Sequence, residues 1–187
     1  KHLDELAALL GLKEPPRIIE SYDISNWGDG TSVAGMVVFE DGKPKKAGYR
    51  RFKMNTVAGT DDYASMAETL ARRAAEYEKG AKGQFGIKPD LLLIDGGRGQ
   101  VSAVQAALAG TQLADVPMFG MVKDDKHRTR GLVSAAGGEI MLAMHRGVFT
   151  FVTSIQDETH RWANDYRRRM QKSRAYSSTL QSVPGVG

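Results

Sequence analysis

Residues 91–100, LLLIDGGRGQ, place a carboxylate where chemistry is possible. Four apolar residues lead directly to Asp95, and Gly96 and Gly97 follow it. In open α/β sheets, ligands bind beyond the carboxyl ends of the parallel strands. A carboxylate at that rim is partly desolvated by the strand beneath it, so its charge needs a counter-ion such as a divalent metal. Asp95 is therefore a candidate metal ligand, with a turn or helix-capping role as the alternative.

The glycines around Asp95 do not fit the common phosphate-binding motifs. DGGRGQ matches neither GxGxxG nor GxxxxGK[ST], which argues against a dinucleotide fingerprint and a P-loop. Because Gly96 and Gly97 have no side chains, they leave the rim uncovered, and a bulky substrate backbone can come close.

A second carboxylate is expected beside the first. The stretch RIIESYDIS (17–25) alternates as a strand does, with Asp23 on the face shared by Ile19 and Ser21. If this strand is the neighbour of 91–95, Asp23 and Asp95 converge at the sheet rim. Paired carboxylates repel each other unless a cation lies between them, so the pair predicts a metal site.

Two further groups are placed to complete the site. Asp62 lies in the first turn of a predicted helix, where interaction with the helix dipole is the alternative explanation. His160, in DETH, lies on the flank of the apolar stripe of the last helix. There it is either simply exposed or offers a ring nitrogen to a metal. Asp157, one turn earlier, is the candidate to orient that ring.

Asp23, Asp95 and His160 together predict oxygen-rich, incomplete coordination of Mg²⁺ or Mn²⁺. Such a site leaves positions for water and phosphate oxygens. A pair of ions there would activate a water and stabilise the leaving 3′ oxygen in phosphodiester hydrolysis.

Positive charge is concentrated at the C-terminal end of the chain. The formal net charge is +4, of which residues 161–187 carry +5 and residues 1–160 carry −1. This asymmetry favours a polyanionic partner such as nucleic acid, with a solvated helix end as the alternative. The basic residues of this segment are Arg161, Arg167, Arg168, Arg169, Lys172 and Arg174.

Hydrophobic periodicity and turn residues divide the chain into a regular order of elements. Three strands joined by short turns predict an antiparallel unit, and helices then alternate with two more strands. The polar, glycine-rich segment 124–138 is predicted to be a mobile excursion. The other predicted ranges are a helix ending near Gly11, strands 17–25, 31–40 and 49–54, helix 61–79, strand 91–95, helix 100–109, strand 116–122 and a final helix with an apolar stripe from Val148 to Tyr166.

The order β-β-β-α-β-α-β-α predicts an α/β, ribonuclease H-like fold: a mixed five-stranded sheet, three antiparallel strands then two parallel, flanked by helices. The expected parts are an N-terminal helix and linker at 1–16, the ribonuclease H-like domain at 17–175, and a linker at 176–187 that begins a further module.

Composition bounds the class of protein. Of the 187 residues, 41% are hydrophobic, enough for one compact core, and none is cysteine. There is no apolar run near the roughly 20 residues of a bilayer span and no secretory signal, so we expect a cytoplasmic protein. The chain starts without Met and stops at VPGVG, which predicts a fragment of a longer protein.

Five motifs, in order, closely resemble those of the UvrC excinuclease family, the nucleases of bacterial nucleotide excision repair. They are YDIS (22–25), VAGMVVFEDGKPKKAGYRRF (33–52), DDYASM (61–66), PDLLLIDGGRGQ (89–100) and DETHR (157–161). The resemblance implies a ribonuclease H-like endonuclease domain that cuts damaged double-stranded DNA on the 5′ side of the lesion.

The resemblance also assigns residues. It implies that Asp23, Asp62, Asp95 and His160 are catalytic, and that Arg98 stands where the family has a lysine in IDGGKGQ, keeping the charge with a different geometry. Arg98 and the basic residues Arg161, Arg167, Arg168, Arg169 and Lys172 are the expected DNA contacts. The final SVPGVG resembles the first hairpin of a helix-hairpin-helix module, and the family's UvrB-binding segment would precede Lys1. The alternatives are another ribonuclease H-like repair nuclease, similar to endonuclease V, and a non-catalytic nucleic-acid-binding module.

Overall fold

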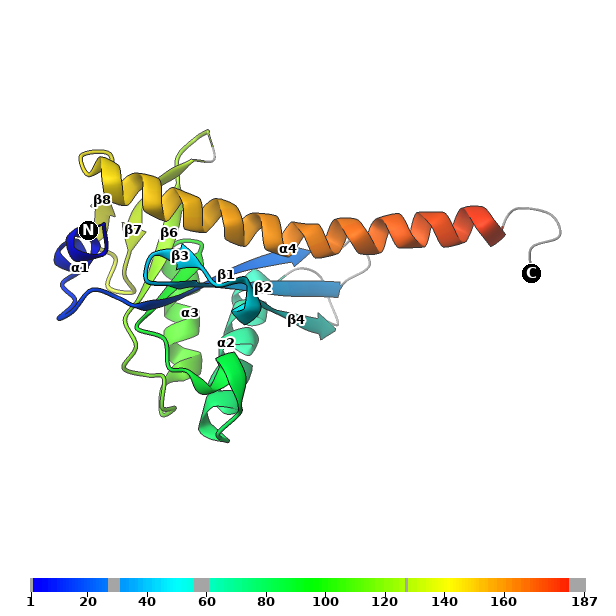
Figure 1. The fold of residues 1–187 in the computed structure, drawn as a ribbon, viewed down its shortest axis with the longest axis horizontal. Helices are drawn as coiled ribbons and strands as arrows, with labels where there is room; N and C mark the ends of the chain where they lie inside the picture. Colours follow the sequence, from blue (N-terminus) through cyan, green and yellow to red (C-terminus); the bar gives the residue numbers. More distant parts are fainter. Residues whose placement is uncertain (1, 27–30, 56–60, 127, 182–187) are drawn as a thin grey trace.

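The computed structural model describes residues 2–26, 31–55, 61–126 and 128–181, which form one mixed sheet with helices on both faces (Figure 1). The strand order is β3-β2-β1-β5-β6-β7-β8, and β4 also pairs with β2. The strands are β1 Ile18–Asn26, β2 Thr31–Glu40, β3 Lys43–Pro44, β4 Arg50–Asn55, β5 Leu91–Asp95, β6 Met118–Lys123, β7 Thr129–Val133 and β8 Glu139–Met141. The helices are α1 His2–Leu10, α2 Asp62–Glu78, α3 Arg98–Leu108 and α4 Arg146–Gln181, with short 3₁₀ turns at Lys46–Gly48 and Gly83–Gly86.

Five of the strands form the predicted ribonuclease H-like arrangement. β1, β2 and β4 are antiparallel neighbours, β5 runs parallel to β1, and β6 runs parallel to β5. Across the sheet their order is β4-β2-β1-β5-β6, so the first and fourth predicted strands are adjacent. The predicted fold class is confirmed, and it brings the two candidate strands of the site side by side.

The sheet is wider than predicted. The expected mobile excursion, residues 124–138, contains β7 and leads into β8, which extend the sheet beyond β6 as antiparallel strands. The prediction was wrong because the segment is mostly glycine and charged residues, and its one short apolar run, Leu132 and Val133, is too brief to indicate a strand. Both residues are buried. Their pairing partner is the open edge of β6, which local sequence does not reveal.

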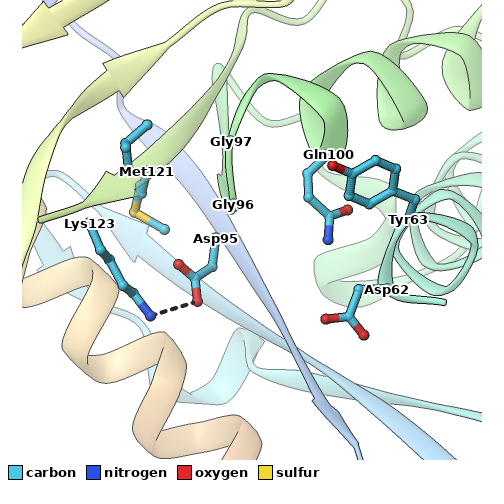
Figure 2. Close-up of a pocket in the computed structure, with 9 residues that line it drawn as sticks. Asp62, Tyr63, Asp95, Gly96, Gly97, Gln100, Met121 and Lys123 are labelled. Atoms are coloured by element: carbon cyan, nitrogen blue, oxygen red, sulfur yellow. Dashed lines mark hydrogen bonds and ion pairs between the residues drawn. The ribbon is translucent and has the colours of Figure 1, made fainter. Parts of the chain in front are cut away.

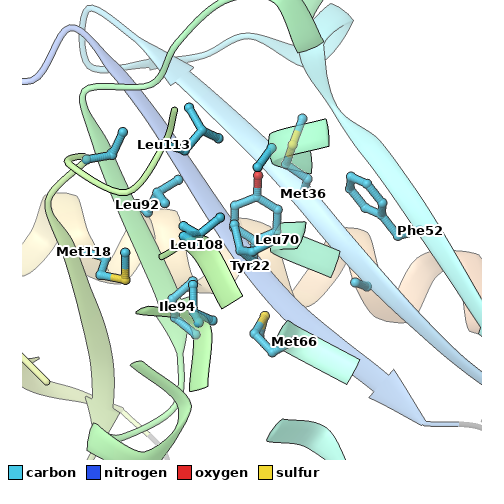
Figure 3. Close-up of a cluster of buried hydrophobic side chains, with 14 of the residues drawn as sticks. Tyr22, Met36, Phe52, Met66, Leu70, Leu92, Ile94, Leu108, Leu113 and Met118 are labelled. Carbon is cyan, nitrogen blue, oxygen red and sulfur yellow. The ribbon is translucent and has the colours of Figure 1, made fainter. Parts of the chain in front are cut away.

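Two hydrophobic layers lie on opposite faces of the sheet. α2 and α3 cover the face on which Tyr22 and Leu92 point (Figure 3). α1 and the first part of α4 cover the other face, where Ile19 and Leu93 are buried. Alternation along β1 therefore sends even-numbered residues toward α2 and odd-numbered residues toward α4. Asp23, an odd-numbered residue, faces α4.

A fully buried ion pair ties β1 to α2. Arg73 donates from Nη2 to Glu20 Oε2 at 2.7 Å, and both side chains are 0% exposed. The Tyr22 hydroxyl donates to Glu20 Oε1 at 2.6 Å, and Arg73 also donates to the backbone carbonyls of Phe85 and Ile87. Charge on the core face of β1 is thus paired and hydrogen-bonded, as burial demands.

The expected division of the chain stays a prediction. Leu6 of α1 is buried in the same core as β1 and β2, and α4 continues through residue 175 without a break. The final residues 182–187, which make up the whole SVPGVG segment of the proposed hairpin, lie outside the described part. Within the described residues, no helix is both long enough and apolar enough to cross a membrane.

Candidate active site

The register of β1 and β5 sets the two central aspartates next to each other. Tyr22 pairs with Ile94, so Asp23 and Asp95 follow one residue further along neighbouring parallel strands. Asp95 is the last residue of β5 and Asp23 lies three residues before the end of β1, both on the face covered by α4. The convergence predicted from strand alternation is confirmed.

His160 of α4 completes the cluster. Its Nδ1 lies 3.1 Å from Asp23 Oδ2. One residue earlier, the Thr159 hydroxyl donates to Ser21 Oγ at 2.8 Å and fixes the helix against β1. Ligand atoms of Asp23, Asp95 and His160 all lie within 4.8 Å of one another.

Gly35 lets α4 approach the sheet at this point. It is the β2 residue paired with Asp23 in the antiparallel register. A methyl group on Gly35 would lie 3.0 Å from Trp162 Cδ1 and 3.1 Å from the Ala163 Cα. A side chain here would push α4 away from the sheet, so glycine allows the close contact that places His160, two residues before Trp162, over the carboxylates.

The electrostatics of the cluster favour a bound cation. The Asp23 side chain is only 10% exposed. Burial raises its pKa to about 6, the hydrogen bond from His160 opposes that rise, and the charge of Asp95 adds to it. The hydrogen bond to Asp23 in turn raises the pKa of His160. Two crowded carboxylates and an imidazole suit Mg²⁺ or Mn²⁺, because a cation relieves the repulsion that makes the charged form of Asp23 unfavourable.

Asp95 is held by two residues that sequence reasoning missed. Gln156 Nε2 donates to Asp95 Oδ1 at 2.9 Å, and Lys123 Nζ lies 3.3 Å from Asp95 Oδ2 (Figure 2 shows the lysine contact). The sequence positions of Gln156 and Lys123 could have indicated that both residues lie near the site. Gln156 precedes His160 by one helical turn, and Lys123 ends β6, whose carboxyl end lies at the same rim as that of β5.

Asp62 lies across a pocket from Asp95 (Figure 2). It begins α2, while Asp61 is the N-cap and accepts from the backbone N–H of Ala64. Asp62 Oδ1 accepts a hydrogen bond of 2.7 Å from Nδ2 of Asn26, the last residue of β1. The pocket between the two carboxylates has a volume of about 420 Å³. Asp62 thus belongs to the rim of the site rather than to the three-residue cluster.

Asn164, one helical turn after His160, contacts the ring of His160. Asn164 Nδ2 lies 3.1 Å from His160 Nε2 and also donates to the His160 carbonyl at 2.8 Å. Asp23 occupies Nδ1, so both ring nitrogens have partners other than Asp157. The role expected of Asp157 stays a prediction, and Asn164, one turn after His160 on the same helix face, is a neighbour whose amide reaches the ring.

The basic candidates lie around the site and beyond it. Arg98 is exposed at the start of α3, and Arg161, next to His160, pairs with Glu158. Further along α4, Arg168 and Lys172 are exposed, and Arg169 pairs with Asp165 while staying largely in solvent. The side chain of Arg167 lies outside the described set. The C-terminal part of α4, which contains Arg168, Arg169 and Lys172, projects past the sheet (Figure 1).

The fold and the site together define a ribonuclease H-like α/β domain in which two carboxylates and a histidine that could hold a metal ion cluster at one edge of the central parallel strands. The chain belongs to the family described as the UvrC RNase H endonuclease domain, whose model matches residues 7–163. Its relatives include the UvrABC system protein C of Alkaliphilus oremlandii, 46% identical over 99% of this chain, and that of Acetivibrio thermocellus, 44% identical over 99%. The chain spans about a third of the length of these relatives, 31% and 32% respectively.

Solved structures with a partial likeness are endonucleases V. The Ciona intestinalis enzyme, in complex with an inosine-containing DNA, matches 58% of this chain and 46% of its own at 16% identity, with a TM-score of 0.43. Human endonuclease V matches 67% of this chain and 62% of its own at 17% identity, also with a TM-score of 0.43.

Proposed function

We propose that this chain is a metal-dependent DNA endonuclease domain that hydrolyses a phosphodiester bond on the 5′ side of a lesion during nucleotide excision repair. The observation that carries the proposal is the convergence of Asp23, Asp95 and His160 within 4.8 Å at the carboxyl ends of two parallel strands. Membership of the UvrC family supports the reaction class and the substrate, damaged double-stranded DNA.

Asp23, Asp95 and His160 are the residues that would hold Mg²⁺ or Mn²⁺. Two carboxylates and one imidazole fit either ion, with open positions for other oxygen ligands. A divalent ion supplies positive charge that stabilises the negative charge developing on phosphate oxygens during hydrolysis.

The protein groups around the cluster each have a task. Gln156 holds one oxygen of Asp95, and Lys123 neutralises the other, so the carboxylate keeps one orientation. Asp23 and Asn164 contact the two nitrogens of the His160 ring, and one of these contacts would give way when a ring nitrogen binds the ion. Asp62, anchored by Asn26, faces the pocket, where its carboxylate is placed to accept a proton from an attacking water.

Family membership and the exposed basic residues together indicate two partners, DNA and UvrB. The exposed basic residues on α4 and Arg98 supply contacts to the DNA backbone. UvrB is the partner that presents the lesion, through a segment before Lys1. The names of the relatives, UvrABC system proteins, support an assembly of this kind, and the location we propose for it is the bacterial cytoplasm.

The test is 5′ incision of a lesion-containing duplex loaded with UvrB, in Mn²⁺ or Mg²⁺. Asp95→Asn is nearly isosteric and removes one charge, so we expect incision to be abolished while the protein stays folded. Asp157→Asn, an exposed carboxylate on α4, is the matched control and should cut normally. Normal incision by Asp95→Asn would remove Asp95 from the site, and cutting of deaminated duplex without UvrB would contradict the assigned substrate.

A further inference from the structure

Strand β7, which lies outside the five-stranded ribonuclease H-like arrangement, begins with a buried polar side chain. Thr129 is 3% exposed, and its hydroxyl donates a hydrogen bond to Oε1 of Gln156 on α4. Gln156 is itself 4% exposed, and its Nε2 donates to Asp95 Oδ1 at 2.9 Å. A continuous chain of hydrogen bonds therefore runs from β7 through α4 to the carboxylate at the end of β5.

The direction of this chain is fixed by its last member. A carboxylate only accepts hydrogen bonds, so the end of the Gln156 amide that faces Asp95 must be the NH₂ group. The amide oxygen then faces Thr129, whose hydroxyl is a group that can donate to it. In this buried contact the hydroxyl thus keeps the amide from turning over, since a reversed amide would set its oxygen against the carboxylate.

A β-bulge sets Thr129 opposite Lys123, the other partner of Asp95. The two residues are paired across β6 and β7, directly after a shift in register between Val122 and Lys123. Opposed residues of an antiparallel pair lie on the same face of the sheet, and a bulge changes the direction of the side chains beside it. Lys123 contacts Oδ2 of Asp95 directly. Thr129 reaches Oδ1 through Gln156, so one cross-strand pair serves both oxygens of the same carboxylate.

The two oxygens of Asp95 are held in different ways. The contact at Oδ1 comes from a buried amide at 2.9 Å whose own oxygen is also hydrogen-bonded. The contact at Oδ2 is longer, 3.3 Å, and comes from a lysine whose side chain is 32% exposed (Figure 2). An exposed ammonium can turn to solvent when a divalent ion arrives, whereas moving the amide would leave two buried hydrogen bonds unmade. Oδ2 is therefore the oxygen that Asp95 can offer to an ion.

We propose that Thr129 is a positioning residue which, through Gln156, keeps Oδ1 of Asp95 occupied and leaves Oδ2 as its single metal-binding oxygen. The inference rests on the proposed metal-dependent function and specifies how one ligand meets the ion. A carboxylate that offers one oxygen suits the octahedral shell of Mg²⁺ or Mn²⁺, whereas Ca²⁺ readily takes both oxygens of a carboxylate. The chain of hydrogen bonds from β7 thus selects for the smaller ions.

Three variants separate positioning from packing. Thr129→Val keeps the shape of the side chain and removes the hydroxyl, and Thr129→Ser keeps the hydroxyl and removes a methyl group. Thr69→Val is the matched control, because Thr69 is fully buried in α2, on the other face of the sheet, and its hydroxyl donates to the Ser65 carbonyl. Any general cost of exchanging a buried hydroxyl for a methyl group appears in both valine variants, so ion binding is what distinguishes them.

The first measurement is the dissociation constant of Mg²⁺, Mn²⁺ and Ca²⁺ for each protein by isothermal titration calorimetry. Thr129→Val should bind Mg²⁺ and Mn²⁺ about tenfold more weakly than wild type, as expected for the loss of a partner behind a metal ligand, and should lose less of its Ca²⁺ affinity. Thr129→Ser and Thr69→Val should bind all three ions as wild type does. A ratio of Mg²⁺ to Ca²⁺ affinity in Thr129→Val equal to that of wild type would overturn the proposal.

The second readout is a crystal structure of the wild-type chain with Mn²⁺, whose anomalous scattering locates the ion independently of activity. The ion should contact Asp95 through Oδ2 alone, with Gln156 Nε2 still at Oδ1. Coordination through Oδ1, or through both oxygens, would overturn the positioning role while wild-type incision leaves the nuclease function standing. A wild-type chain that neither binds Mg²⁺ or Mn²⁺ nor cuts DNA in the UvrB-loaded assay would reject the proposed function and this inference with it.

Discussion

His160 Nδ1 on α4 and Asp23 Oδ2 on β1 are 3.1 Å apart, so one hydrogen bond joins the longest helix to the central strand at the rim of the site. The contact is possible because Thr159 and Ala163, on either side of His160, pack against the sheet with no exposed surface. The cluster of Asp23, Asp95 and His160 is therefore a property of helix docking as much as of the strands.

Divalent ions should stabilise the folded chain through this cluster. A ligand that binds only the native state adds RT ln(1 + [L]/Kd), about 2.7 kcal/mol at a hundredfold excess over Kd. Melting temperature should rise with Mn²⁺ or Mg²⁺ for wild type and much less for Asp23→Asn or Asp95→Asn. His160→Ala should lose more of the Mn²⁺ shift than of the Mg²⁺ shift, because imidazole suits the softer ion.

The control for this melt series is Asp157→Asn, which changes an exposed carboxylate outside the three-residue cluster and should shift as wild type does. Equal shifts in wild type and in both cluster variants would show that the ions bind elsewhere.

Gly35→Ala should weaken the site without touching it. The added methyl would meet Trp162 and Ala163 at 3.0 to 3.1 Å, so α4 must move away from β2. We expect a loss of about 1–3 kcal/mol of unfolding free energy, typical of overpacking, and a smaller Mn²⁺-induced rise in melting temperature. Gly138→Ala, where a methyl meets nothing within 4 Å, is the control. If Mn²⁺ raises the melting temperature of Gly35→Ala as much as that of wild type, metal binding does not depend on the docking of α4.

Neutralising Arg167, Arg168 and Arg169 together should weaken binding to all DNA sequences alike. Each lost phosphate contact on duplex reduces the slope of log affinity against log salt by roughly 0.9. Fluorescence anisotropy across a salt series measures that slope. An unchanged slope would mean that these arginines form only a solvated helix surface.

The buried pair of Glu20 and Arg73 should be costly to break. Arg73→Met leaves Glu20 without its counter-ion in the core and should destabilise the protein by about 3–5 kcal/mol in urea unfolding. The exposed neighbour Arg72, which pairs with Glu68 at 3.5 Å, is the control, and Arg72→Met should cost less than about 1 kcal/mol. A small effect of Arg73→Met would mean that Glu20 is protonated or hydrated in the variant.

The strands that carry the site were predictable because their patterns are local. β2 and β5 have the predicted bounds, and alternation correctly put Asp23 on the face of Ile19. The supporting residues were not predictable in this way. Gln156, Lys123 and Asn164 acquire their roles only when α4 and β6 dock beside β5, and Arg73 looks like a surface residue until Glu20 appears opposite it.

Because α4 is continuous from Arg146 to Gln181, it fixes the distances between the cluster and the residues that follow it along the helix. A helix rises 1.5 Å per residue, so Arg168 stands about 12 Å beyond His160 along the axis, and Gln181 about 30 Å beyond it. The helix therefore fixes how far each basic residue after His160 lies from the cluster of Asp23, Asp95 and His160. Inserting a single residue after Ala163 would move each later basic residue about 1.5 Å outward and turn it by about 100° around the helix axis. The cluster itself would stay in place.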